Sequence, residues 1–496
     1  MGRMSGEDLH SEAPGEEPGR KDDLALMAKS TAALVCILFT TSLMNIVVFP
    51  QFDEVFTYAR DISVTFNAVS FLVLGGIAAY RPAWLRVRIF NRIVFAFLLV
   101  GAVGLVPLLA ADSAIGITLA SSLLAIGRAW VSLVVAMAVS RLPLSRIGEC
   151  VTLSFVLDYA LRAAAWFMPI GVGTILFLVL PFVGWVLTWS VARPVLESTE
   201  QGEAPAEFSI TQPASFLPFN SQMFICFFLF SLSFGYSLRY GEIDGTPLAD
   251  FFVIVPVAIV CIYVIAARKS VPADLLSQVA VLFAVAGFFT AVIKFDYSSG
   301  VAVTLLSCGS TLFDMVAWTT LLSVAARNER GAVAAFAWGR GVTGFGTLAG
   351  AALGVAANDL TGGAVMPVEL ISGALILIFV GYALIGMRSF SFSETIAGLT
   401  PVSEEVAETP EQDFEERCQA IADAAGLTPR ELEVFQMLAR GRDTAYIQEQ
   451  LVVSRNTVKA HVKHVYAKLD IHSHQELIDL VEDGDQIPAR SGARAS

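Results

Sequence analysis

Five ionisable residues interrupt otherwise apolar stretches of this sequence. Placing such a side chain at the centre of a bilayer costs about 2.5 to 3.5 kcal/mol, so it normally faces a protein interior or a cavity. Three arginines against two aspartates leave a positive charge uncompensated, and a buried surplus of this kind favours an anionic ligand such as a carboxylate. We therefore expect a ligand-binding site or a switch at Arg128, Asp158, Arg162, Asp314 and Arg340.

The same residues could also act only as ties between helices. Asp158 and Arg162 are four residues apart, which places them on one helix face within reach of an ion pair. Asp314 could pair with Arg128 or with Arg340. Nearby aromatic side chains could wall a pocket for an apolar or aromatic ligand, although packing alone also explains them. They are Trp130, Tyr159, Trp166, Trp318, Phe336 and Trp338.

A second cluster with recognisable chemistry lies near the C-terminal end. From Arg455 to Lys468 there are four Lys or Arg residues and no acid. In a helix over this segment Val458, Val462 and Val465 share one face, which leaves small, polar and basic side chains on the other. A basic helix that follows a shorter helix and a tight turn is typical of the recognition helix that a helix-turn-helix protein lays in the major groove.

The sequence does not signal catalytic or metal chemistry. Its six cysteines lack CxxC or CxxH spacing. The histidines His461, His464, His472 and His474 lack a cysteine or acid at the usual zinc spacing. There is no nucleophile motif, HExxH motif or nucleotide-binding loop. We expect no enzyme activity, no metal and no cofactor.

Long apolar runs must position the five intramembrane charges. The 496 residues are 55% hydrophobic and 16% charged, against about 25% charged in soluble proteins. A helix that crosses a bilayer needs about 20 apolar residues. Twelve such runs lie near residues 30–50, 62–80, 90–111, 114–140, 149–168, 170–192, 219–238, 251–267, 275–293, 300–326, 331–357 and 367–387. The run at 331–357 is rich in glycine, which predicts close contact with neighbouring helices.

The distribution of Lys and Arg sets the expected orientation. With a cytoplasmic N-terminus, sixteen Lys or Arg residues fall in the inside segments, and only Arg60, Arg239 and Lys294 fall in outside loops. An even number of spans returns the C-terminus to the cytoplasm. We expect a multi-pass protein of the inner (cytoplasmic) membrane with both termini in the cytoplasm.

The composition divides the chain into seven segments, and the predicted fold is all-α. They are an acidic disordered tail (1–28), a membrane half of six helices (29–192), a cytoplasmic linker (193–218), a second half of six helices (219–388), an acidic linker (389–426), a DNA-binding domain (427–483) and a disordered tail (484–496). Within the acidic linker, residues 413–425 have helical composition. Six plus six spans around a central linker resemble the major facilitator superfamily, and the resemblance implies two pseudo-repeated halves.

The DNA-binding segment begins with a capping box, in which Thr428 and Glu431 start a helix. From there the chain follows the pattern LTxRExEVLxLLAxG...IAxxLxxSxxTVKxHVxxIxxKL. It is met by Leu427, Thr428, Arg430, Glu431, Glu433, Val434, Gly441, Ile447, Leu451, Ser454, Asn456, Thr457, Val458, Lys459, His461, Val462, Lys468 and Leu469. The segment closely resembles the LuxR/GerE family of DNA-binding domains.

That resemblance implies a four-helix module whose last helix, here near 475–481, often mediates dimerisation. By matching positions it also implies which side chains meet DNA. They are Thr457, Val458, Lys459 and His461, together with Asn456 and Lys463.

The sequence as a whole predicts a membrane-embedded one-component transcriptional regulator. Its twelve-helix domain would sense a small molecule, anionic or aromatic, and its C-terminal domain would bind double-stranded DNA as a homodimer. The alternative is a facilitator-type transporter with a regulatory DNA-binding tail.

Overall fold

A computed structural model defines most of the chain. It describes residues 18–56, 58–201, 222–240, 247–267, 272–293, 298–327, 329–360, 366–386, 390–397, 410–439, 444–451, 455–469, 471, 476–477 and 480–481. All regular structure in these residues is helical, as the sequence predicts. The chain forms two compact units, Met1–Pro401 and Val402–Ser496.

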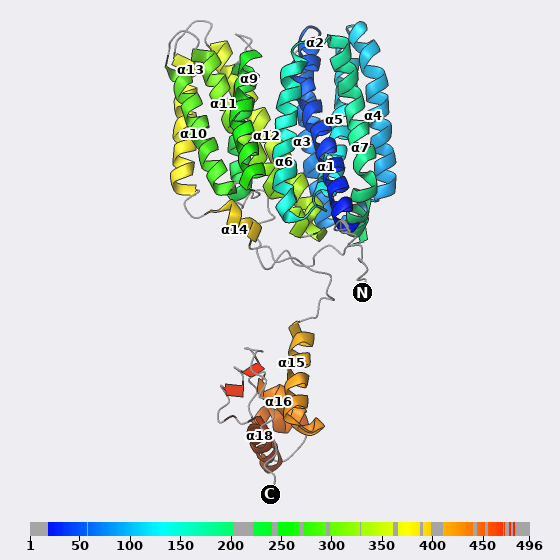
Figure 1. Cartoon of the computed structure of the whole chain (residues 1–496), viewed down its shortest axis with the longest axis vertical. Coiled ribbons are helices and arrows are strands. Elements are labelled where there is room, and N and C mark those ends of the chain that lie inside the picture. Colours follow the sequence, from blue (N-terminus) through cyan, green and yellow to red (C-terminus); the bar gives the residue numbers. More distant parts are fainter. Residues whose placement is uncertain are drawn as a thin grey trace, which may run out of the picture. The chain divides into compact units, whose positions relative to one another are not determined.

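The first unit is a bundle of long helices arranged as two halves (Figure 1). The first half contains α1 (Pro18–Leu43), the π-helical turn η1 (Met44–Val48), α2 (Phe49–Asp53), α3 (Ala59–Tyr80), the 3₁₀ turn η2 (Pro82–Trp84), α4 (Val87–Ala110), α5 (Ala114–Val139), α6 (Leu144–Ala165) and α7 (Ile170–Gln201). The second half contains α8 (Gln222–Tyr240), α9 (Pro247–Ala267), α10 (Ala273–Val292), α11 (Ser298–Arg327), α12 (Glu329–Leu360), α13 (Met366–Gly381) and η5 (Tyr382–Gly386).

These helices coincide with the apolar runs of the sequence. Among the described residues, a helix covers each of the twelve predicted runs. In the described part of the chain, eight helices are long and apolar enough to cross a membrane, so the chain is a multi-pass membrane protein. Helices α6 and α12, which carry three of the five intramembrane charges, are not among the eight. Twelve crossings therefore stay a prediction.

Helix α12 joins the two halves. It packs along α8 of its own half and along α3 of the first half. A side chain at Gly350 would collide with the backbone carbonyl of Leu232 on α8, and one at Gly341 would collide with Leu72 on α3. Small residues let helix backbones approach this closely, so the predicted role of the glycines is confirmed.

Helix α7 is longer than the sequence predicts. It continues to Gln201, so the first nine residues of the predicted linker 193–218 are helical. The extension is held in place because Leu196 is fully buried and because Glu197 accepts hydrogen bonds from two arginines. Arg193 Nε lies 2.9 Å and Arg88 Nε 3.4 Å from Glu197 Oε1. The rest of the linker lies outside the described residues.

The other predicted tails and linkers also contain helix. Helix α1 begins at Pro18, inside the predicted N-terminal tail 1–28, because Leu26 and Met27 already pack on the core. The predicted acidic linker 389–426 contains α14 (Phe392–Ala397) and α15 (Pro410–Ala425). Residues 1–17 and 482–496 lie outside the described residues.

The second unit has its own hydrophobic core. It contains α15, α16 (Pro429–Ala439), α17 (Thr444–Leu451) and α18 (Arg455–Leu469), and Figure 1 shows α15, α16 and α18 grouped together. Helix α15 contributes the buried Cys418 and Ile421 to this core, so the unit begins before Leu427, where the sequence placed its start. Leu477 and Val481 are buried in the same core, but much of the predicted last helix lies outside the described residues.

Candidate functional site

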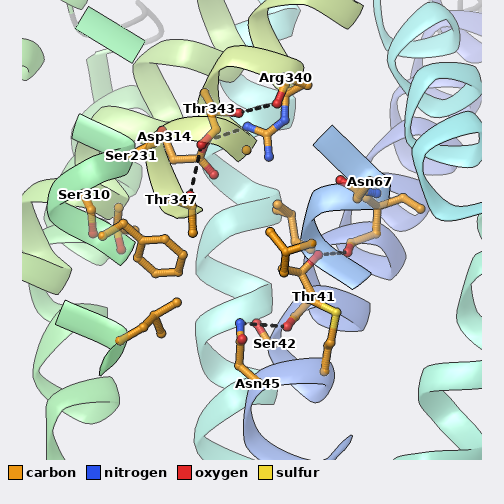
Figure 2. Close-up of a pocket in the computed structure, with 18 of the residues that line it drawn as sticks. Thr41, Ser42, Asn45, Asn67, Ser231, Ser310, Asp314, Arg340, Thr343 and Thr347 are labelled. Carbon is orange, nitrogen blue, oxygen red and sulfur yellow. Dashed lines mark hydrogen bonds and ion pairs between the residues drawn. The ribbon is translucent and has the colours of Figure 1, made fainter. Parts of the chain in front are cut away.

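A cavity of about 250 Å³ lies between the two halves of the membrane domain. Residues of α1, α3, α5 and α6 form its wall on one side, and residues of α8, α11 and α12 form it on the other. Figure 2 shows Asp314, Arg340, Thr343 and Thr347 facing Thr41, Ser42, Asn45 and Asn67 across this space. The structure brings all five predicted intramembrane charges to the wall. They are Arg128, Asp158, Arg162, Asp314 and Arg340.

Asp314 and Arg340 form an ion pair across α11 and α12. Arg340 Nη1 lies 2.8 Å from Asp314 Oδ1, so of the two partners that the sequence left open for Asp314, the structure contains Arg340. The guanidinium also lies over the ring of Trp318, 4.9 Å from its centroid, where the ring quadrupole attracts a cation. The aspartate side chain is 37% exposed and the arginine side chain 22%. The pair therefore faces the open cavity.

Asp158 and its neighbours tie α6 to both halves. Asp158 is buried and accepts a hydrogen bond from Ser42 Oγ on α1 at 3.0 Å. Tyr159 Oη lies 2.5 Å from Thr311 Oγ1 on α11. The guanidinium of Arg162 lies over the Tyr159 ring, 5.3 Å from its centroid. The Asp158–Arg162 ion pair stays a prediction.

Helix α5 contributes a further cavity arginine, Arg128. It projects from α5, its Nε is buried without a hydrogen-bond partner, and no ion pair joins it to a carboxylate in the described part of the chain. Its Cζ lies 5.1 Å from the centroid of the Phe177 ring on α7. Arg128 therefore supplies positive charge to the cavity that the described residues do not neutralise.

The structure adds charged residues that the sequence analysis did not assign to the site. Arg239 lies in α8 with a side chain only 5% exposed, and its Nη2 is 3.0 Å from Oδ2 of Asp61 on α3. This ion pair joins the two halves. Asp61 and Arg60 both line the cavity, which gives a wall with four arginines and three aspartates. Sequence reasoning missed them because they lie at helix ends, where a charge is unremarkable.

The predicted DNA-contacting side chains lie on α18, and one of them is placed differently from the prediction. Val458 is fully buried in the core of the second unit, so it packs α18 against the unit and does not reach DNA. Its place on the apolar face of the helix is the physical reason. The others lie at the surface, exposed at Asn456, Thr457, Lys459 and Lys463 and half-buried at His461.

Two charged residues at the start of α16 position the helices around it. Glu431 Oε2 accepts the backbone N–H of Thr428 at 2.8 Å, which confirms the predicted capping box, and accepts Lys468 Nζ at 2.6 Å. The hydrogen bond from Lys468, with those from Thr428, lowers the pKa of Glu431 to about 2. Arg430 Nη2 donates to the carbonyl of Leu451 at the end of α17, at 3.0 Å. The recognition helix is thus tied to α16 by a carboxylate that is ionised at neutral pH.

Comparison with known proteins identifies the C-terminal part. Residues 425–481 match the GerE family model, described as bacterial regulatory proteins of the luxR family. This part is 47% identical over 55 residues to the transcriptional activator protein ExaE of Pseudomonas putida, covering 11% of this chain and 26% of that protein. It is 43% identical over 53 residues to the oxygen regulatory protein NreC of Staphylococcus haemolyticus, covering 11% and 24%. The chain thus spans about a quarter of the length of these curated relatives.

The membrane domain is similar in fold to a solved transporter. The human organic anion transporter MFSD10 (TETRAN) matches with a TM-score of 0.52 at 12% identity, over 74% of this chain and 99% of that one. FucP, a Major Facilitator Superfamily transporter, matches with a TM-score of 0.44 at 14% identity, over 72% and 98%. At sequence identities this low, the similarity concerns the fold and not the function. The chain joins a membrane domain of facilitator-like fold to a LuxR-family helix-turn-helix domain.

Proposed function

We propose that this protein is a membrane-embedded one-component transcriptional regulator that senses a small anionic molecule. The observation that carries the proposal is Arg128, whose guanidinium lies in the cavity with no carboxylate partner among the described residues. A buried charge without a partner is costly, and a ligand carboxylate would offset that cost through charge-assisted hydrogen bonds. The apolar remainder of the ligand would lie against the aromatic wall at Tyr159 and Trp318.

The output of this regulator is DNA binding by the second unit. The exposed face of α18 would contact double-stranded DNA through Asn456, Thr457, Lys459, His461 and Lys463. A homodimer would bind two half-sites, as helix-turn-helix proteins usually do. The domain reaches DNA only from the cytoplasm, and the distribution of Lys and Arg favours an inner-membrane protein with both termini on that side.

A thermal-shift experiment tests the anion site. The full-length protein in lipid nanodiscs is heated with a panel of small organic acids, each compared with its neutral amide, beginning with benzoate and benzamide. A ligand that binds only the folded state raises the melting temperature. We expect at least one acid to do so in the wild type and in the control Arg92→Gln, whose side chain is exposed on α4, but not in Arg128→Gln. The proposal fails if every stabilising compound acts equally as acid and amide.

A transporter with a DNA-binding tail is the second candidate. The cavity lies between the two halves of the membrane domain, which is where facilitator-type transporters bind their substrates. Uptake of the stabilising acid into proteoliposomes separates the candidates. A regulator that only senses gives no uptake above protein-free liposomes, whereas a transporter accumulates the acid.

A further inference from the structure

One carboxylate holds helix α14 against the membrane domain. Asp274, near the start of α10, accepts hydrogen bonds from Ser391 Oγ at 2.9 Å, from the backbone N–H of Phe392 at 2.7 Å and from that of Ser393 at 3.3 Å. The first N–H groups of a helix have no partner inside it. Asp274 therefore fixes the beginning of α14 on α10, at the end of the bundle where Figure 1 shows α14.

The ring of Phe392 fastens the same segment. Phe392 is fully buried, and its centroid lies 6.4 Å from that of Phe227 on α8, 5.9 Å from that of Phe313 on α11 and 4.8 Å from that of Phe390. Aromatic pairs at such distances attract each other. We call the segment 390–397, held by these rings and by Asp274, the latch.

The ring that anchors the latch also belongs to the cavity wall. Phe313 and Phe230 both line the cavity and stack with centroids 3.8 Å apart. The residue after Phe313 is Asp314, which is paired with Arg340. Phe313 thus contacts the cavity and Phe392 at once.

The latch also lies on the covalent route to the DNA-binding unit. Twelve residues, 398–409, separate its end at Ala397 from the start of α15 at Pro410. A chain of that length spans at most about 43 Å when fully extended. Releasing the latch adds the eight residues 390–397 to this tether, which lengthens its maximal span by roughly 25 to 30 Å.

We infer that the latch transmits occupancy of the cavity to the DNA-binding unit. The inference rests on the proposed function, because it assumes an anionic ligand. An anion that binds near Arg128 and Arg340 competes with Asp314 for the Arg340 guanidinium. When Asp314 moves, the adjacent Phe313 moves with it, the contact with Phe392 loosens and the latch is freed. The longer tether then changes which DNA sites the second unit reaches and how its copies pair.

Hydrogen exchange on the full-length protein in nanodiscs tests this inference, together with affinity for a genomic DNA fragment that the same protein selects. Phe392→Ala and Asp274→Asn should each raise exchange in the latch by about tenfold and shift the DNA affinity in the same direction. Phe289→Ala, which removes an exposed ring of α10, and Asp112→Asn, in an exposed turn, are matched controls that should change neither quantity. If both latch variants open the latch and DNA affinity stays at the wild-type value, the inference is overturned.

A separate variant tests whether the cavity controls the latch. Arg340→Gln removes the partner of Asp314 and should raise exchange in the latch without any ligand present. Arg340→Lys, which keeps a cation beside Asp314, should instead leave latch exchange and DNA affinity close to the wild-type values. The second variant keeps the test decisive if Arg340→Gln folds poorly. Unchanged latch exchange in Arg340→Gln would show that the latch is only a structural anchor.

The failure of this inference is distinguishable from failure of the proposed function. If no acid stabilises the protein selectively but the latch variants shift DNA affinity, the anion site is wrong, and the latch controls the DNA-binding unit without transmitting an anion signal. If an acid binds through Arg128 but the latch variants leave DNA affinity unchanged, the anion site stands and the latch is wrong.

Discussion

Glu431 couples the charge of one side chain to the position of the recognition helix. Its pKa is lowered from 4.5 to about 2 in the folded protein. The carboxylate therefore stabilises the second unit fully above pH 4.5, and this stabilisation is lost as the pH falls toward 2. Glu431→Gln should lower the free energy of unfolding at neutral pH by about 1 to 3 kcal/mol, and the difference from wild type should vanish in acid.

Urea unfolding of residues 402–496, followed by circular dichroism, measures this effect. The unit has its own core, so the fragment is a fair test. Glu433→Gln is the matched control, because Glu433 forms an ion pair with Arg430 in which its side chain is 48% exposed. Such pairs contribute about 0 to 1 kcal/mol. Equal losses in the two variants would contradict the role given to Glu431.

Among single residues, the sequence identifies those of the cavity wall well where a charge interrupts an apolar run. Arg128 and Arg340 are conspicuous for that reason, and both line the cavity. Asp61 and Arg239 are not conspicuous, because each lies near the end of its helix, and only the packing of α3 and α8 on α12 brings them together. Val458 was assigned to DNA from a matching motif, although its spacing from Val462 and Val465 already placed it on the apolar face that the structure buries.

Among the elements, the lysines on α18 predict how DNA affinity depends on salt concentration. Lys459 and Lys463 lie on its exposed face. If each contacts a phosphate, Lys459→Ala and Lys463→Ala should weaken DNA binding and each reduce the slope of log affinity against log salt by about 0.9. Titration of the selected DNA fragment at several salt concentrations measures the slope. Unchanged affinity in both variants would exclude α18 as the recognition helix.

The close contact between α8 and α12 predicts that an added methyl group destabilises the membrane domain. Gly350→Ala places a methyl group against the backbone of Leu232, and such overpacking costs about 1 to 3 kcal/mol. We expect a lower melting temperature in detergent and a lower abundance in the membrane. Gly373→Ala on α13, where nothing lies within 4 Å of the added methyl, is the control and should behave as the wild type. Equal behaviour of the two variants would contradict close packing of α8 on α12.

The sequence predicts the existence of the helices better than their ends. Apolar runs locate α3 and α5 because hydrophobicity alone defines a helix in the bilayer. The end of α7 depends instead on contacts with other segments, namely the burial of Leu196 and the hydrogen bond of Glu197 with Arg88. The latch was also hidden, because Phe392 lies in a segment whose acidic composition is typical of a solvated linker.

For the whole molecule, the two units work together only if the second faces the cytoplasm. Reporters fused after Arg388 should read as cytoplasmic, and reporters placed between α8 and α9, in residues 241–246, should read as external. The prediction rests on sixteen inside against three outside Lys and Arg residues. Paired phosphatase and fluorescent fusions at both sites provide the measurement. An external C-terminus would separate the LuxR-type domain from DNA.

The central claim is that the cavity controls the DNA-binding unit through Arg128 in its wall. The most direct measurement is the affinity of the full-length protein in nanodiscs for its selected DNA fragment, with and without the acid that stabilises the wild type. We predict that the acid changes this affinity in the wild type and in Arg92→Gln, and that Arg128→Gln binds DNA at the wild-type basal affinity but no longer responds. An equal response in Arg128→Gln and in the wild type would contradict the account.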